Sequence, residues 1–214
     1  MIKNIILDVG GILFDDSKEN IEKVLNKNCD YIYKVAYGKD FKKCLLGNLD
    51  INEYINGLKN EKNFNDIKYI LEKGNLKETY PLIKNNFEFV KTLKDRGYNI
   101  YLLTNITEDS FNYINGIINI NEIFAGGIYS FQEHLIKPNR EIYSLLIDRF
   151  RLNIKETLFF DDKEKNVTTA NELVQGISKK QESYNSYLSE EIKNEEKEIF
   201  ANFYSKTNSC TDKC

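Results

Sequence analysis

Near its start the chain carries a short apolar run that ends in an acid. Residues 5–7, Ile-Ile-Leu, precede Asp8, and Gly10 and Gly11 follow two residues later. A short apolar run without a helical stripe is typical of a strand that is buried on both faces. Such a strand presents Asp8 at its carboxyl end, and the two glycines, which have no Cβ, allow a ligand to approach the chain closely.

Residues 17–80 show apolar positions at helical spacing and no strand signal. Residues 15–17, Asp-Asp-Ser, are candidate N-caps for the first helix. Asp50 and Glu53 resemble a capping box ahead of a later helix. The pattern therefore predicts a small all-helical insert after the first strand.

From residue 82 onward, helix and strand patterns alternate. Apolar runs predict buried strands over residues 100–103, 126–129 and 157–160, with a helical stripe after each. This alternation implies parallel strands joined by right-handed crossovers. The fold class is therefore α/β, with a Rossmann-like parallel sheet core that is wrapped by helices and carries a helical cap insert.

The same patterns divide the chain into three parts. We expect an α/β core from residues 1–16 and 81–185, and a helical cap from residues 17–80. Residues 186–214 are predicted to form a charged terminal helix and a frayed tail. A further strand is weakly signalled near Ile177.

Composition excludes several classes of protein. The 214 residues are 41% hydrophobic and 29% charged, which is ordinary for a globular protein. A net charge of -3 provides no basic footprint for nucleic acid. No apolar run reaches membrane-spanning length, and the first residues lack a signal-peptide pattern. The four cysteines form no CxxC pair. We therefore expect a cytoplasmic protein with reduced thiols that binds neither nucleic acid nor membrane.

Polar groups follow the ends of three predicted strands. They are Asp8, Thr104 and the pair Asp161 and Asp162, with Lys137 on a loop between the last two. Singly, the acids and the threonine could cap helices or satisfy backbone groups, and the lysine could be a solvated surface residue. Together they favour a ligand site, because ligands of parallel sheets bind at the carboxyl ends of the strands.

This set of groups suits attack by a carboxylate on a phosphoryl group. A carboxylate and a phosphate repel one another, so a metal ion and a cation must offset the charge. Asp8 and Asp162 are hard oxygen ligands that suit Mg²⁺, and Asn166 is a neutral ligand or an orienting group. Lys137 would neutralise phosphate oxygens, and the Thr104 hydroxyl would donate a hydrogen bond to them.

These residues resemble the motifs of the haloacid dehalogenase-like (HAD) hydrolases. The four matching segments are Asp-Val-Gly-Gly-Ile-Leu at 8–13, Leu-Thr-Asn at 103–105, Lys-Pro at 137–138 and Phe-Phe-Asp-Asp at 159–162, followed by Asn166. The resemblance extends from residue 1 to about residue 178. Residues 130–143 are especially similar to the branch whose helical cap lies between the first two motifs.

The resemblance implies a role for each matching residue. Asp8 would be the nucleophile that forms an aspartyl-phosphate on a small phosphorylated metabolite, with Thr104 and Lys137 as catalytic partners. The implied magnesium-binding residues are Asp8, Gly10, Asp161, Asp162 and Asn166, and the implied phosphate-binding residues are Gly11, Thr104, Asn105 and Lys137.

One position departs from the family pattern. The family usually has a second acid two residues after the nucleophile, and Gly10 stands there. General acid and base catalysis contributes about 10² to 10⁴ in rate, so its loss would weaken the enzyme. Some members similar to sugar-phosphate phosphatases also carry glycine here. His134, the sole histidine, is a candidate replacement acid or base, and its alternative is a surface-loop role.

Two hypotheses follow. The first is a Mg²⁺-dependent phosphatase for a small phosphorylated metabolite such as a sugar phosphate. The second is a weakened or inactive relative that binds a ligand or a partner. The substrate and the oligomeric state stay open, because the residues of the insert that could reach the site serve equally well as its core or surface: Tyr31, Tyr33, Tyr37, Lys42 and Tyr54.

Overall fold

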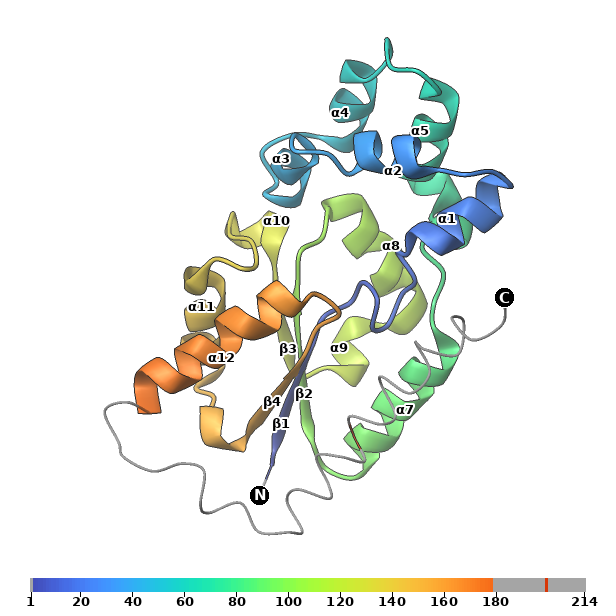
Figure 1. The fold of residues 1–214 in the computed structure, drawn as a ribbon. Coiled ribbons are helices and arrows are strands. Elements are labelled where there is room, and N and C mark those ends of the chain that lie inside the picture. The colour runs from blue at the N-terminus through green and yellow to red at the C-terminus, as the bar shows by residue number, and fades with distance from the viewer. Residues whose placement is uncertain (1, 179–198, 200–214) are drawn as a thin grey trace.

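A parallel β-sheet forms the centre of the molecule (Figure 1). The computed structural model describes residues 2–178 and residue 199. The four strands are β1 (Asn4–Leu7), β2 (Asn99–Thr104), β3 (Gly126–Tyr129) and β4 (Thr157–Phe160), in the order β3-β2-β1-β4. Every neighbouring pair is parallel, and Ile6 of β1 aligns with Tyr101 of β2 and Phe159 of β4. The predicted α/β fold and its four strands are confirmed.

Helices cover both faces of this sheet (Figure 1). Ile5 and Leu7 point to one face, in an apolar cluster with residues of α7 (Lys84–Asp95) and α8 (Glu108–Ile118). Ile6 points to the other face, in a cluster with residues of α11 (Arg140–Phe150) and α12 (Glu164–Ser178). The alternation follows from the two-residue period of a strand. Three short helices complete the core: α9 (Ile120–Ile123), α10 (Ser130–Glu133) and the 3₁₀ turn η2 (Ile154–Glu156).

The segment between residues 17 and 80, here called the insert, is helical. Its elements are α1 (Lys18–Leu25), α2 (Asp30–Ala36), α3 (Phe41–Leu45), α4 (Ile51–Gly57), α5 (Phe64–Leu71), the 3₁₀ turn η1 (Lys73–Asn75) and α6 (Leu76–Thr79). Ser17 and Asp50 are N-caps, as predicted: Ser17 accepts one hydrogen bond from a backbone amide of the first turn and Asp50 accepts two. The insert has an apolar cluster of its own and lies over the carboxyl ends of the strands (Figure 1).

One joint between the insert and the core is formed by the end of α3 and by α10. The Ser130 hydroxyl donates to the Leu45 carbonyl at 2.6 Å, and His134 Nδ1 lies 2.7 Å from the Leu46 carbonyl oxygen. Gly47 follows with a φ of 67°, and a Cβ at this position would overlap the carbonyl of Phe131. The close approach at this joint therefore depends on glycine.

One predicted element is wrong. Ile177 lies in α12, which continues through Gly176 to Ser178, so no strand forms there. One glycine costs a helix only about 1 kcal/mol, and α12 packs Ala170 and Leu173 against the sheet, so the glycine does not end it. The predicted terminal helix and tail lie outside the described residues, except for the buried Ile199. Within residues 2–178, no helix has the length and hydropathy that a membrane crossing needs.

Candidate active site

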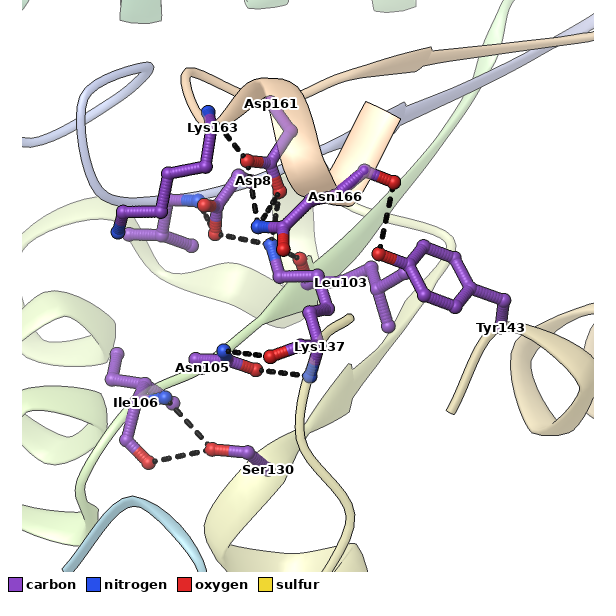
Figure 2. Close-up of polar contacts among 11 residues, drawn as sticks. Asp8, Leu103, Asn105, Ile106, Ser130, Lys137, Tyr143, Asp161, Lys163 and Asn166 are labelled. Carbon is purple, nitrogen blue, oxygen red and sulfur yellow. Dashed lines mark hydrogen bonds and ion pairs between the residues drawn. The ribbon is translucent and has the colours of Figure 1, made fainter. Parts of the chain in front are cut away.

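Lys137 is the centre of a buried cluster at the strand ends (Figure 2). Its ammonium nitrogen lies 2.9 Å from Asp8 Oδ1 and 2.5 Å from Asp161 Oδ2, and it donates to the Leu103 carbonyl at 2.7 Å. The Lys137 side chain is 0% exposed. The cation therefore belongs to the interior, and the reading of a solvated surface lysine is excluded. Two carboxylates and a carbonyl offset the cost of burying it.

Asp161 is held in place on all sides. Asn166 Nδ2 donates to both of its carboxylate oxygens, at 2.8 and 3.0 Å, and the Lys163 backbone amide donates to Oδ1 at 2.9 Å. Burial, and then the neighbouring Asp8, raise the pKa of Asp161, while Lys137 acts in the opposite direction. With its oxygens engaged in this way, Asp161 is arranged to orient Lys137.

The acids form a set that fits a small hard cation. Asp8, Asp161 and Asp162 have carboxylate oxygens that lie within 4.8 Å of one another, and Asp162 is the exposed member. Two oxygens bound to one Mg²⁺ lie at most about 4.2 Å apart, so a small adjustment would suffice. Gly11 makes room for this arrangement, because a Cβ there would lie 2.7 Å from Asp162 Cγ. Asn166 Oδ1 is a buried oxygen without a hydrogen-bond partner among the described residues.

The predicted phosphate-binding residues divide into two groups. Thr104 is buried at the end of β2, next to the cluster. The side chain of Asn105, in contrast, is already engaged, because it donates to the Lys137 carbonyl at 3.0 Å and accepts from the Lys137 amide at 2.8 Å (Figure 2). Asn105 therefore positions the loop that carries Lys137, and the second N–H of its side-chain amide is still available as a donor at the cavity wall.

Asp16, which the sequence suggested only as a candidate N-cap, lies at this site. A Cβ built on Gly10 would be 2.5 Å from Asp16 Oδ2, so the Asp16 carboxylate fills the space of a side chain at position 10. Burial raises the pKa of Asp16 to about 6, Lys163 lowers it, and Asp162 and Asp8 add to the rise. The chain thus places a carboxylate where the family pattern has an acid.

Lys163 is the second functional group that was missed. Burial alone would lower its pKa, but the surrounding carboxylates, Asp16 first, outweigh burial and raise it. Lys163 directly follows the pair Asp161 and Asp162 in the chain. This adjacency to two candidate site residues could have identified Lys163 from the sequence. No such feature of the sequence identifies Asp16 as a site residue, because neither spacing nor periodicity links it to Gly10.

His134 does not join the cluster. The residue is exposed, and its ring contacts the Leu46 carbonyl in the joint with the insert. The sole histidine therefore lies in the joint between α3 and α10 and has no contact with Asp8 or Lys137.

A cavity of about 890 Å³ separates the insert from the strand ends. Asp16, Lys137 and Lys163 line its core side, and Asp8 is buried next to Lys137 with 4% exposure. Tyr33, Tyr37 and Lys42 line it from the insert, whereas Tyr54 donates to backbone carbonyls inside the insert and Tyr31 pairs with Glu61 on its surface.

Comparison with solved structures shows the same fold. The HAD family enzyme bt-2542 of Bacteroides thetaiotaomicron, solved with magnesium and inorganic phosphate, is 21% identical, with a TM-score of 0.62 over 81% of this chain and 91% of that one. A predicted HAD-like family hydrolase from Porphyromonas gingivalis is also 21% identical, with a TM-score of 0.61 over 86% of this chain and 100% of that one.

Sequence comparison gives the family. The sesquiterpene phosphatase astK of Aspergillus oryzae is 31% identical over 81 residues, which are 38% of this chain. The match spans only 41% of the length of that curated relative. The family model for haloacid dehalogenase-like hydrolases matches residues 2–173, which include every residue of the cluster described above. The chain therefore belongs to the haloacid dehalogenase-like hydrolase family.

Proposed function

We propose that the protein is a Mg²⁺-dependent phosphatase that hydrolyses a small phosphorylated metabolite through an aspartyl-phosphate on Asp8. The observation that carries the proposal is the convergence of Asp8, Lys137 and Asp162 at one edge of the sheet. The related enzyme with bound magnesium and phosphate, and the relative named as a sesquiterpene phosphatase, support the same reaction class.

The hydrogen bonds of Asp8 select the attacking atom. Oδ1 accepts from the Val9 amide at 2.7 Å and lies 2.9 Å from the Lys137 ammonium, so Oδ2 is the oxygen left to attack phosphorus. A bond forms between Oδ2 and phosphorus as the bond from phosphorus to the leaving oxygen breaks. Water then attacks the phosphorus of the aspartyl-phosphate and releases phosphate and the Asp8 carboxylate.

The positive charge at the site reduces the repulsion between carboxylate and phosphate. Lys137 supplies one cation, and the Thr104 hydroxyl would donate to a phosphate oxygen. Asp8, Asp162 and the Gly10 carbonyl would hold Mg²⁺, which when bound offsets the remaining negative charge. Asp161 and Asn166 keep Lys137 in position.

We assign the proton transfers to Asp16 on the basis of its position. Its carboxyl group occupies the place of the side chain that is absent at Gly10 and lines the cavity where a leaving group would depart. In the first step Asp16 would give its proton to the leaving oxygen. In the second step its carboxylate would take a proton from the attacking water.

The insert would act as the cap of this active site. It lies over the strand ends, has its own apolar cluster and forms the outer wall of the cavity. Covering the site excludes bulk water during transfer to Asp8. We therefore keep the division into a core of residues 1–16 and 81–185 and a cap of residues 17–80.

The test of the proposed function is phosphate release from p-nitrophenyl phosphate and from a panel of sugar phosphates in the presence of Mg²⁺. Wild-type protein should release phosphate, and chelation of the metal should stop release. Asp8→Asn should abolish release and leave the circular dichroism spectrum unchanged. Binding of beryllofluoride or phosphate without turnover on any substrate would instead support a ligand-binding module.

A further inference from the structure

The wall of the cavity carries far more positive charge than one phosphate group requires. Its described lining includes six lysines and a single acid, Asp16. Two of these lysines, Lys137 and Lys163, face the carboxylates of the cluster. The remaining lysines in the lining are Lys34, Lys39, Lys42 and Lys165. The whole chain, in contrast, has a net charge of -3, so this excess is local.

Three of the unmatched lysines come from one segment of the insert. Lys34, Lys39 and Lys42 are exposed, and among the described residues none of them forms an ion pair. Lys43, one residue further on, differs in both respects, because it pairs with Asp40 at 2.9 Å and lies outside the lining. Exposed lysines that form no ion pair at the edge of a cavity can bind an anion.

Aromatic side chains alternate with these lysines. Tyr33, Tyr37 and Phe41 line the cavity, and their ring centroids are 4.7 Å apart for the first pair and 5.2 Å for the second. The Tyr33 hydroxyl donates to the Asp16 carbonyl at 3.0 Å, which joins the aromatic row to the site. A row of rings offers a wall for a planar or apolar body.

We propose, on the basis of the proposed phosphatase function, that the substrate is a phosphate monoester with a planar or apolar body and a second phosphate group. The scissile phosphate lies at Asp8 and Lys137. The body lies along Tyr33, Tyr37 and Phe41, and Lys34, Lys39 and Lys42 bind the second phosphate. The volume of about 890 Å³ leaves room for such a molecule.

Matched substrates separate recognition of a second phosphate from general attraction of anions. Adenosine 3′,5′-bisphosphate should have a KM at least about tenfold lower than that of adenosine 5′-monophosphate, an effect equal to about one charge-assisted hydrogen bond. The KM of fructose 1,6-bisphosphate, which lacks a planar body, should lie between the KM values of the two adenosine compounds. Equal KM values for the two adenosine compounds would overturn the proposal.

The triple variant Lys34→Ala/Lys39→Ala/Lys42→Ala tests the subsite directly. Its KM for adenosine 3′,5′-bisphosphate should rise at least about tenfold more than its KM for p-nitrophenyl phosphate, which has no second phosphate. The control Lys43→Ala removes a neighbouring lysine outside the cavity and should change neither KM. Equal increases for both compounds in the triple variant would show electrostatic steering alone and would contradict the proposal.

A binding measurement keeps this inference separate from the proposed function. Isothermal titration calorimetry with Asp8→Asn protein measures the Kd of adenosine 3′,5′-bisphosphate without turnover. That Kd should rise at least about tenfold when the triple substitution is added. If wild-type protein hydrolyses none of the compounds, the proposed function fails and the Kd values still decide the subsite. If p-nitrophenyl phosphate is hydrolysed and the Kd values agree, only the subsite is wrong.

Discussion

Burial of Asp16 links its proton to the stability of the fold. Its pKa rises from 3.8 to about 6 in the folded protein, so the folded state binds this proton more tightly than the unfolded chain does. The ionised carboxylate is therefore a destabilising group above about pH 6, and the penalty disappears as the pH falls toward about 4. Its size at neutral pH is up to about 3 kcal/mol.

Asp16→Asn should remove this penalty and impair catalysis at the same time. In metal-free buffer at about pH 7.5, its free energy of unfolding should exceed the wild-type value by up to about 3 kcal/mol, and the two values should converge near pH 4. Its turnover should fall by about 10² to 10⁴. Urea denaturation at several pH values and phosphate release measure the two effects. Unchanged turnover would remove the proton-transfer role of Asp16.

The close packing of Gly11 against Asp162 leads to a second prediction at the residue level. Its φ is +70°, and a Cβ there would collide with the Asp162 carboxylate, so Gly11→Ala should displace a proposed metal ligand. The Mg²⁺ concentration for half-maximal activity should rise at least about tenfold. Gly97→Ala is the matched control, because its φ is +90° and nothing lies within 4 Å of the added Cβ. Both variants should lose more than about 1 kcal/mol of stability because of the positive φ, with the larger loss for Gly11→Ala, and only Gly11→Ala should change the Mg²⁺ response.

The position of His134 in the joint between α3 and α10 predicts a structural role for this residue. Its ring bonds the Leu46 carbonyl, so His134→Ala should lower the free energy of unfolding by about 0.5–1.5 kcal/mol and leave kcat unchanged. Thermal or urea denaturation and steady-state kinetics test this. A loss of kcat of tenfold or more at an unchanged KM would restore the acid or base role that the sequence suggested.

The helices and strands could be predicted from the sequence more completely than the way their side chains meet. Strand patterns, N-caps such as Ser17 and the helical spacing of the insert are local signals, and the structure confirms them. The position of Asp16 depends on how the chain turns after β1, where Gly10 and Phe14 form a bridge and the Gly11 amide donates to the Phe14 carbonyl at 2.8 Å. No periodicity encodes such a turn, so the sequence could not show that Asp16 returns to Gly10.

In the candidate active site, too, the sequence predicted the positions of residues better than the orientations of their side chains. The motif positions placed Asp8, Lys137 and Asp161 at neighbouring strand ends, and the structure brings these three side chains into contact. The orientation of Asn105 toward the Lys137 backbone, and that of Tyr33 toward the cavity, depend on packing between segments far apart in the chain. Such orientations have no signal in a single sequence.

At the scale of the whole molecule, the acidic cluster predicts stabilisation by magnesium. At a Mg²⁺ concentration of about 100 Kd, binding to the folded state alone adds about 2.7 kcal/mol. For a chain of this size, that corresponds to a Tm increase of roughly 5–10 °C. Scanning calorimetry with and without Mg²⁺ measures the shift. Asp162→Asn removes one proposed ligand and should reduce the shift to a small fraction, and an equal shift in the variant would place the ion elsewhere.

The hydroxyl of Ser130 is one of the polar groups that join the insert to the core. Its oxygen accepts from the Ile106 amide at 2.9 Å, and its one proton points to the Leu45 carbonyl at 2.6 Å while the Ile106 carbonyl lies 3.2 Å away. If the insert swung outward, the proton could rotate to the second carbonyl and no buried donor would be stranded. Outward movement of the insert would therefore leave the Ser130 hydroxyl hydrogen-bonded within the core, and the hydrogen bonds behind it need not break when a ligand enters or leaves.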